Sequence, residues 1–386
     1  MPAAAPATAS HPIIAPATLG LLGGGQLGRF FVQAAHELGY RVIVLDPDPQ
    51  SPAGRIADRH LAAAYEDPAA LDVLATGCAA VTTEFENVPA ATLGYLARST
   101  RVRPSAAAVA VCQDRIAEKT FLRDQGLPHG PFAMIRSEGD LEAAPASVFP
   151  GILKVARFGY DGKGQARVAD RAAARTAFRQ LKGEACVLEA QLPLDCEVSV
   201  VLARDAAGAA TCFPVAENQH RHGILDVSIV PARVSPALAS AARDCALRIA
   251  AALQYIGTLG VEFFVSRGAL YVNEMAPRPH NSGHYTLDAC LTSQYEQQVR
   301  ALCGLPLGDP GLTGPAVMVN LLGDLWSAGE PDWARLLARP GLKLHLYGKE
   351  SARPGRKMGH FTVLGTDPSA VLESALAART AIGIRD

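Results

Sequence analysis

The stretch "ALYVNEMAPRPHNSGH", residues 269–284, joins a strand to a polar loop and decides how the rest of the chain is interpreted. Glu274 lies in the middle of this strand, as Glu262 does in the preceding apolar segment "GVEFFV", residues 260–265. Two carboxylates on adjacent strands repel each other unless a cation lies between them. Together with Asn273 they offer the hard oxygen ligands that suit Mg²⁺. The competing interpretation, with one carboxylate facing inward and the other outward, predicts no site.

The loop after this strand is crowded with polar side chains, namely Arg278, His280, Asn281, Ser282 and His284. Its two histidines have the HxxxH spacing of a helical metal site, but Pro279 and Gly283 argue against the helix that such a site requires. We therefore expect the loop to form a pocket for a small anion.

A second glycine-rich stretch, "RFGYDGKGQ" at residues 157–165, places Lys163 among three glycines. Such a loop offers amide donors and can close over nucleotide phosphates, although the GxxxxGK[ST] pattern of a P-loop is absent. A β-hairpin with Asp-Gly at its tip is the plain alternative. Lys154, a single cation in the apolar strand before the loop, favours phosphate binding, and otherwise it is an edge lysine.

The segment "VLEAQLPLDCEVSV", residues 187–200, contributes Glu189 and Glu197. Carboxylates in such positions can accept hydrogen bonds from an adenine amino group or from ribose hydroxyls. Solvated strand ends are the alternative interpretation of both residues.

The glycine-rich stretch nearest the N-terminus, "LGLLGGGQLGRFF" at residues 19–31, has the GxGxxG spacing of a dinucleotide-binding turn. It opens a helical pattern, and "YRVIVLD" at residues 40–46 is a buried strand that ends in Asp46. Strand, glycine turn, helix and strand form a βαβ unit, which predicts a parallel sheet. A helix N-terminus favours any phosphate or carboxylate, so NAD, a phosphorylated substrate and a simple packing turn all remain open.

Near the C-terminus, "YGKESARPGRKMGHFTV" at residues 347–363 carries four basic residues, Lys349, Arg353, Arg356 and Lys357. They form either an ordinary basic surface loop or a clamp for a substrate phosphate.

The 386 residues include 36 basic and 37 acidic ones, a balance that gives no support to a nucleic-acid or anionic-membrane surface. The absence of an 18-residue apolar run predicts no transmembrane helix. The eight cysteines form no CxxC pair, so we expect reduced thiols in the cytoplasm and no structural zinc.

The pattern of apolar and turn residues predicts four parts: a disordered Ala/Pro-rich tail at 1–17, a Rossmann-like domain at 18–115, a small α+β domain at 116–192, and a mostly antiparallel domain at 193–386.

Taken in order, these stretches resemble the N5-carboxyaminoimidazole ribonucleotide synthases, which are ATP-grasp ligases of de novo purine biosynthesis. The matching segments, from about 20 to 365, are "GGGQLGR", "TTEFENV", "QDRIAEK", "LKVARFGYDGKGQ", "EVSV", "NQHRHGIL", "NEMAPRPHNSGH" and "YGKESARPGRKMGH". Each is modest alone, but all of them in this order are highly specific. The resemblance implies an ATP-grasp fold of mixed α/β and α+β class, with an N-terminal Rossmann-like (pre-ATP-grasp) parallel sheet and a small C-terminal β-rich region that binds phosphate.

For the nucleotide, the resemblance implies that Arg115 and Lys154 contact the ATP phosphates while the glycine loop closes over them as a lid. The loop residues concerned are Gly159, Tyr160, Asp161, Gly162, Lys163, Gly164 and Gln165. The expected adenine contacts are Glu189 and the adjoining Ala190, Gln191 and Leu192. The remaining expected contacts are Glu197 for ribose, His220 at the pocket edge, and Glu262, Asn273 and Glu274 for Mg²⁺, with Mn²⁺ as the alternative metal.

For the other substrates, the resemblance implies that Arg278, His280 and Asn281 hold bicarbonate and its phosphorylated product. The expected contacts of 5-aminoimidazole ribonucleotide are Lys349 and Arg356 at its 5′-phosphate, and Gln26, Glu84 and Tyr160 around its pocket. The implied catalytic residues are Lys154, Asp161, Arg278, His280 and Asn281. Glu84, Asp161 and the released phosphate are the candidates for deprotonating the substrate amine.

The implied reaction carboxylates 5-aminoimidazole ribonucleotide. Bicarbonate attacks the γ-phosphate of ATP to give carboxyphosphate and ADP, and the CO₂ that carboxyphosphate releases is captured by the exocyclic amine as a carbamate. A lid is needed because carboxyphosphate hydrolyses readily in water. The expected partners are therefore small molecules, without nucleic acid or membrane, and the expected assembly is a cytoplasmic homodimer.

Three other functions compete with this one. The formate-using glycinamide ribonucleotide transformylase shares the phosphate and metal sites but should lack the "HNSGH" and "YGKESARPGRK" patterns. An NAD-dependent oxidoreductase needs the first glycine turn but leaves Glu262, Glu274 and the second glycine loop unexplained. A non-catalytic nucleotide-binding regulator is disfavoured by the intact pair of carboxylates.

Overall fold

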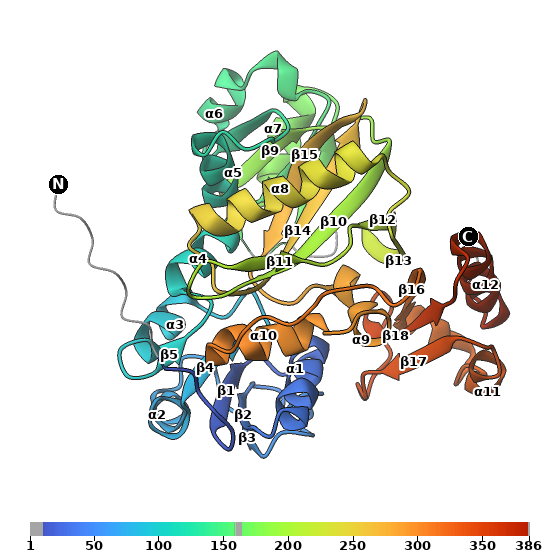
Figure 1. Ribbon diagram of the computed structural model, residues 1–386. Coiled ribbons are helices and arrows are strands. Elements are labelled where there is room, and N and C mark those ends of the chain that lie inside the picture. The colour runs from blue at the N-terminus through green and yellow to red at the C-terminus, as the bar shows by residue number, and fades with distance from the viewer. Residues whose placement is uncertain (1–10, 158, 160–163, 385–386) are drawn as a thin grey trace.

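The computed structural model in Figure 1 describes residues 11–157, 159 and 164–384. Four predicted site residues, Tyr160, Asp161, Gly162 and Lys163, lie outside the described residues, as do residues 1–10 of the predicted tail. Residues 11–17 are ordered against the first domain and α10, since Tyr40 Oη donates to Ile13 O at 2.7 Å and Ile13 N donates to Cys303 O at 2.8 Å. The tail prediction is therefore wrong for 11–17, because Ile13, Ala15 and Ala17 pack against the apolar core. None of the described helices has the length and apolar character needed to span a bilayer.

The N-terminal sheet is parallel, as the βαβ pattern predicts. Its spatial order is β3 (Arg59–Leu61), β2 (Arg41–Leu45), β1 (Thr18–Leu22), β4 (Ala80–Thr83) and β5 (Arg101–Val102). The order runs from β1 outward in both directions, so the crevice at the carboxyl ends of β1 and β4 is a topological switch point, where open α/β sheets bind ligands. Gln26 and Glu84 lie close behind these two strand ends. The helices of this domain are α1 (Gln26–Glu37), α2 (Pro68–Gly77), α3 (Ala90–Leu96) and α4 (Ala106–Cys112).

The second sheet is antiparallel and belongs to the small domain. Its order is β6 (Phe132–Ile135), β9 (Cys186–Ala190), β7 (Gly151–Val155) and β8 (Gln165–Val168). Its neighbouring helices are α5 (Arg115–Asp124), α6 (Glu138–Ala143), η1 (Ala146–Val148) and α7 (Arg171–Gln180). Because β7 lies between β9 and β8, Lys154 is on an interior strand and the edge-lysine interpretation is wrong.

The third sheet is antiparallel and has nine strands in the described part of the chain. Its main path is β15 (Ala269–Ala276), β14 (Gly257–Ser266), β10 (Cys196–Arg204), β12 (Ala216–Arg221), β13 (Ile224–Val230), β16 (Ala316–Leu322), β18 (Lys357–Leu364) and β17 (Leu342–Leu346), and β11 (Ala210–Cys212) pairs with β10. The C-terminal β-rich region therefore continues this sheet instead of forming one of its own.

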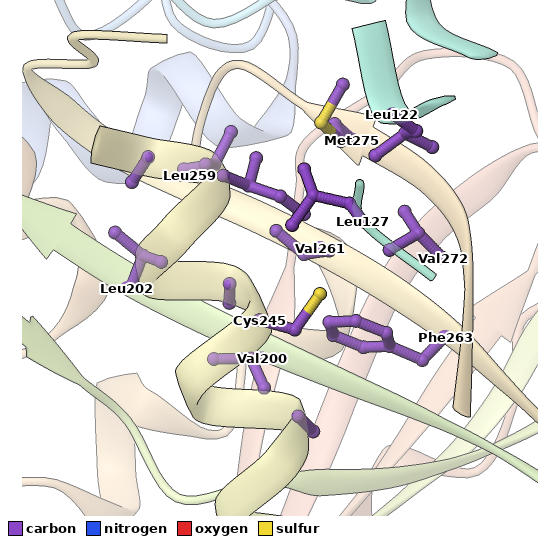
Figure 2. Close-up of a cluster of buried hydrophobic side chains, with 14 of the residues drawn as sticks. Leu122, Leu127, Val200, Leu202, Cys245, Leu259, Val261, Phe263, Val272 and Met275 are labelled. Atoms are coloured by element: carbon purple, nitrogen blue, oxygen red, sulfur yellow. The ribbon is translucent and has the colours of Figure 1, made fainter. Parts of the chain in front are cut away.

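Helix α8 (Pro236–Ala252) covers one face of this sheet at β10, β14 and β15 (Figures 1 and 2). Side chains on the opposite face of these strands therefore point away from α8. The core beneath it includes Val200 of β10 together with Val261 and Phe263 of β14, all at most 1% exposed. Burying a side chain of this size contributes about 1.5–3 kcal/mol. Because successive residues of a strand point to opposite faces, burying Val261 and Phe263 turns Glu262 toward the other side.

Helix α10 (Gln294–Cys303) packs between the N-terminal and third sheets, where it contacts α1, β4 and β14 (Figure 1). The sequence did not predict it, because three of its buried residues are glutamines and mask the apolar periodicity. Gln294 Nε2 donates to His280 O at 2.8 Å, and its Oε1 accepts from His280 N at 2.8 Å. Gln298 Nε2 likewise donates to Thr82 Oγ1 at 2.7 Å. These amides tie the polar loop to the first domain.

The N-terminal, central and C-terminal parts of the chain meet in a cluster of six rings, which we call the junction cluster: Phe30, His284, Tyr295, His345, Tyr347 and His360. The ring of Phe30 has its centroid 5.2–5.9 Å from those of the other five. The remaining elements are η2 (Asn281–Gly283), α9 (Thr286–Ala289), η3 (Gly323–Ala328), α11 (Trp333–Leu337) and α12 (Pro368–Ala381).

Candidate active site

Glu262 and Glu274 are register partners on β14 and β15, so their side chains share one face of the sheet. A β-bulge follows at once, because Phe263 pairs with Val272 and leaves Asn273 as the extra residue. Asn273 Nδ2 donates to Glu262 Oε2 at 3.4 Å. The predicted pairing of the two carboxylates is confirmed, and the alternative with one facing inward and one outward is wrong.

The electrostatics of this pair suit a cation. Burial and the charge of Glu274 raise the pKa of Glu262 to about 7, although His220 acts in the opposite direction. A divalent cation among these oxygen atoms would relieve that repulsion. The two carboxylates therefore fit Mg²⁺, and Mn²⁺ as well. His280 Nε2 lies 3.4 Å from Glu262 Oε1 at the edge of this group.

His280 is oriented by a chain of buried hydrogen bonds. Its links are Ser228 Oγ to Asn218 Oδ1 at 2.8 Å, Asn218 Nδ2 to Ser199 Oγ at 2.9 Å, Ser199 Oγ to Ser282 Oγ at 2.7 Å, and Ser282 Oγ to His280 Nδ1 at 2.8 Å. The backbone N of Ser282 also donates to Nδ1, at 3.4 Å, so Nδ1 is an acceptor. Ser282 Oγ therefore donates its proton to Nδ1 and accepts from Ser199 Oγ. The ring then carries its proton on Nε2, facing Glu262. Burial and the charge of Arg278 lower the pKa of His280 to about 3, which keeps this ring neutral.

The polar loop presents a fixed cation and an unsatisfied amide. Arg278 Nε donates to Glu86, which belongs to the first domain, and the two form a partly buried ion pair. Asn281 is 7% exposed, and neither polar atom of its amide has a hydrogen-bond partner among the described residues. A loop that carries both a buried, unpaired amide and a guanidinium suits a small planar anion. The expectation of an anion pocket in this loop agrees with this chemistry.

Arg115 extends the site toward the small domain. Its Nη1 lies 3.6 Å from Glu274 Oε2, and its Nη2 donates to Gly159 O at 3.4 Å. One pocket is lined by Arg115, Gly159 and Glu274 together with Glu86 and Arg278. This pocket therefore takes one residue from each predicted group: Arg115 for phosphate, Glu274 for the metal and Arg278 for the small anion.

Glu189 of β9 lies between two lysines, Lys154 of β7 and Lys119 of α5, the second of which is one helical turn after Arg115. Glu189 Oε1 lies 3.0 Å from Lys154 Nζ, and its Oε2 lies 3.1 Å from Lys119 Nζ. Burial alone would raise the pKa of Glu189, but the two ammonium groups outweigh it and lower that pKa to about 2. Glu189 is therefore an ionised, buried residue and not the solvated strand end of the alternative interpretation. Ala190, Gln191 and Leu192 follow it at the end of β9.

Glu197 and His220 face each other from β10 and β12, with Glu197 Oε2 3.1 Å from His220 Nδ1. Burial lowers the pKa of His220, but the hydrogen bond to Glu197 and the nearby carboxylates raise it above its usual value. This pair lies on the same sheet as Glu262 and Glu274, whose charges contribute to that shift.

The glycine loop connects two adjacent antiparallel strands, since Lys154 of β7 pairs with Gln165 of β8. Val155 N donates to Gly164 O at 2.8 Å, and Gly164 has a φ of 71°, in the left-handed region. The hairpin interpretation is thus correct for the flanking strands. It neither supports nor excludes a lid, because residues 160–163 of the loop lie outside the described residues.

The first glycine turn is satisfied by carboxylates of the protein itself. Gly25 N and Gly28 N donate to the two oxygens of Glu84 at 2.7 and 3.0 Å, and Gly24 N donates to Asp46 Oδ2 at 2.6 Å. A Cβ added at Gly25 would lie 2.8 Å from Glu84 Oε1. These amides are not open to a dinucleotide pyrophosphate, so the packing-turn interpretation is favoured. Burial raises the pKa of Glu84, against the effect of the two amides.

The basic loop lies against the first domain. Lys349 Nζ donates to Gln26 Oε1 at 2.8 Å, and Gly348 O accepts from Arg55 Nη1 at 3.1 Å. Arg356 Nη1 donates to both the carbonyl and the hydroxyl of Ser351 at 2.9 Å. Two of the residues predicted to contact the ribonucleotide are therefore direct neighbours.

A second group of possible metal ligands consists of Asp288 and two histidines of the junction cluster, His345 and His360. The rings of His345 and His360 stack 4.7 Å apart with an angle of 22° between their planes. His345 Nε2 already pairs with Asp288 Oδ2, and His360 Nδ1 with Tyr347 Oη, each at 2.9 Å. We assign this group to packing.

Sequence reasoning missed three charged residues of the site, namely Glu86, Glu118 and Lys119. Glu118 and Lys119 are each 1% exposed, and Glu118 Oε1 accepts from Met275 N at 2.5 Å. A signal was present, because Glu118 and Lys119 fall on the same face of the helix as the apolar Leu122. Charged residues on a buried face are costly to bury and indicate a specific partner.

The chain is similar to known proteins over nearly its whole length. Family models match it as a ribonucleotide synthetase preATP-grasp domain at 16–113, an ATP-grasp domain at 120–295 and a phosphoribosylaminoimidazole carboxylase C-terminal domain at 316–374. It is 45% identical over 349 residues to the N5-carboxyaminoimidazole ribonucleotide synthase of Brucella melitensis, covering 89% of this chain and 95% of that protein.

Solved structures agree with these matches. N5-carboxyaminoimidazole synthetase from Staphylococcus aureus, complexed with ADP, is 36% identical with a TM-score of 0.90, covering 97% of this chain and 100% of that one. N5-carboxyaminoimidazole synthase from Aspergillus clavatus, in complex with ADP and 5-aminoimidazole ribonucleotide, is 30% identical with a TM-score of 0.87, covering 95% and 98%.

Proposed function

The chain belongs to the N5-carboxyaminoimidazole ribonucleotide synthase family of ATP-grasp ligases, and from this premise we propose which of its residues carry out the reaction. The reaction joins bicarbonate to the amine of 5-aminoimidazole ribonucleotide at the expense of ATP, in purine biosynthesis. The assignment rests on one observation above all, the 3.6 Å contact between Arg115 and Glu274. It brings a cation for phosphate next to the carboxylates for the metal.

Activation of bicarbonate takes place between Arg115, Lys154 and the glycine loop. Bicarbonate is a poor electrophile, so its oxygen attacks the γ-phosphate of ATP to give carboxyphosphate and ADP. The two cations and the amides of the loop, including Tyr160, Asp161 and Lys163, stabilise charge on the transferring phosphoryl group. When held by Glu262, Asn273 and Glu274, Mg²⁺ or Mn²⁺ supplies further positive charge to the phosphates.

Bicarbonate and its phosphorylated product are held by the polar loop. The Arg278 guanidinium, fixed by Glu86, pairs with the anion, and the Asn281 amide gains its missing hydrogen bonds. Neutral His280 donates from Nε2 and adds no charge of its own, which is consistent with its buried hydrogen-bond chain.

The ribonucleotide lies between Gln26 and the basic loop, with its 5′-phosphate on Lys349 and Arg356 and with Tyr160 beside it. Its amine captures the CO₂ released from carboxyphosphate. Both oxygens of Glu84 already accept hydrogen bonds from Gly25 and Gly28, which weakens its case as the base. Asp161 or the released phosphate then takes the proton.

The nucleotide base is held by Glu189 and the backbone of residues 190–192, and the ribose by Glu197, with His220 at the edge.

We place the domain limits at 18–115, 116–192 and 193–386, and we propose a cytoplasmic homodimer. Light scattering on the purified protein tests the assembly.

The decisive measurement is ADP release from ATP, Mg²⁺ and bicarbonate, with and without 5-aminoimidazole ribonucleotide, while the carbamate product is followed in parallel. We expect strong stimulation by the ribonucleotide and loss of both signals in Glu274→Gln. Stimulation by glycinamide ribonucleotide and formate instead would assign these two compounds as the substrates and keep the ATP-dependent chemistry. NADH binding without nucleotide turnover would contradict the proposal altogether.

A further inference from the structure

Lys119 is an almost fully buried cation that the proposed chemistry does not use. It is 1% exposed, and its ammonium has three acceptors: Glu189 Oε2 at 3.1 Å, Asn273 O at 2.9 Å and Val272 O at 3.3 Å. An ammonium group has three protons, so all of them are already engaged within the protein. Lys119 therefore has no donor left for a substrate.

Lys154 differs from Lys119 in this respect. In the described part of the chain its ammonium contacts Glu189 alone, at 3.0 Å from Oε1, and the side chain is 11% exposed. Protons of Lys154 are therefore available to a phosphate, whereas those of Lys119 are not. The two lysines share one carboxylate and have different tasks.

The charges of these three groups explain the difference. Two ammonium groups around one carboxylate leave a net positive charge of one. This charge is available at Lys154, because Lys119 is surrounded by its three acceptors. Without Lys119, Glu189 and Lys154 would neutralise each other as an ion pair. Separating a buried ion pair costs a large free energy, because each charge then lacks its partner. ATP would then have to compete with Glu189 for Lys154.

We propose that Lys119 is a positioning residue that neutralises Glu189 and so keeps the positive charge of Lys154 free for ATP. The inference rests on the proposed contact between Lys154 and the ATP phosphates. It also gives a reason for the position of Lys119 on α5, a helix that lies beside β9. From there its ammonium reaches both Glu189 of β9 and the Asn273 carbonyl of β15.

The test compares Lys119→Met, Glu189→Gln and the double variant Lys119→Met/Glu189→Gln in steady-state kinetics and in ADP titration by calorimetry. We expect Lys119→Met to raise KM for ATP and Kd for ADP by about tenfold or more, with a smaller change in kcat and none in KM for the ribonucleotide. The double variant should return to within about threefold of Glu189→Gln, because no carboxylate remains to trap Lys154. Arg123→Met, which removes an exposed cation from the same helix, is the matched control and should bind ATP normally.

Two results would overturn the inference: an unchanged KM for ATP in Lys119→Met, or a double variant that binds ATP no better than Lys119→Met. The second result would show that Lys119 has only a structural role, in which its hydrogen bonds hold α5 against β15. If Lys119→Met does not fold, the comparison of Glu189→Gln with the double variant decides, since removing Lys119 should then cost little ATP affinity. A wild-type protein that neither binds ADP nor turns over ATP would instead refute the proposed function, and this inference with it.

Discussion

The amide oxygen of Gln26 lies 2.8 Å from the ammonium nitrogen of Lys349, although 323 positions separate the two residues in sequence. The contact brings the start of α1, at the switch point of the first sheet, against the basic loop before β18. Lys349 also donates to Lys357 O at 2.7 Å, which fixes its direction. The proposed ribonucleotide site is therefore assembled from the two ends of the chain.

Replacing Lys349 with Met should weaken ribonucleotide binding selectively. The variant loses a charge-assisted contact to phosphate, so KM for 5-aminoimidazole ribonucleotide should rise about 10- to 100-fold while KM for ATP stays unchanged. Initial-rate kinetics with each substrate varied in turn checks this. Lys343→Met, which removes an exposed lysine of β17, is the control. Equal changes in both KM values would refute the assignment of Lys349.

Replacing Glu274 with Gln should abolish most of the activity without unfolding the protein. The variant removes one oxygen charge from the metal and phosphate site, and we expect kcat to fall about 100-fold or more. ADP release at saturating substrates measures this, and thermal unfolding verifies the fold. Glu217→Gln serves as the control, because that carboxylate lies on the same sheet but pairs with Arg233. Activity in Glu274→Gln close to that of the control would contradict the proposed metal site.

Stabilisation by Mg²⁺ should grow with pH. Burial and Glu274 raise the pKa of Glu262 from 4.5 to about 7 in the metal-free protein, so its proton is bound more tightly when folded than when unfolded. The stability from this group is complete below pH 4.5 and is lost as the pH rises through 7. Mg²⁺ requires the ionised carboxylate, so the rise in Tm caused by Mg²⁺ should be larger at pH 8 than at pH 6. Glu262→Gln should remove this pH dependence, and an equal rise at both pH values in the wild type would count against the site.

Replacing Glu86 with Gln should impair the use of bicarbonate. Arg278 would keep its charge but lose the carboxylate that directs it, so we expect KM for bicarbonate to rise about tenfold with little change in KM for ATP. Rates measured against bicarbonate concentration in CO₂-depleted buffer test this. Glu66→Gln, an exposed change in the same domain, should behave as wild type. A variant whose bicarbonate dependence is unaltered would mean that Glu86 does not position Arg278.

The carboxylate pair could be predicted because strand alternation is a local property. Glu262 lies between residues buried under α8, and its partner Glu274 follows after a short hairpin, so pairing and facing both follow from nearby sequence. Lys154 and the glycine loop were found for the same reason, since strand and loop are consecutive.

Long-range contacts escaped sequence reasoning. Nothing near Gln26 indicates that Lys349 reaches it, and nothing near Arg278 indicates its pairing with Glu86. Helix α10 was missed because its buried glutamines serve hydrogen bonds to other elements, and polar residues at core positions erase the apolar period. The role of Glu84 within the glycine turn likewise depends on how β1 and β4 pair.

The junction cluster has a consequence for how the protein is made. Phe30, near the start of the chain, belongs to a core that also includes Tyr295, Leu302 and Tyr347. A ribosome has therefore released about 300 residues before the apolar face of α1 can be covered, and the proposed first domain leaves the exit tunnel with an incomplete core. Its core is complete only when α10 and Tyr347 have been made, and until then its exposed apolar surface favours aggregation. A fragment cut at residue 115 should aggregate for the same reason.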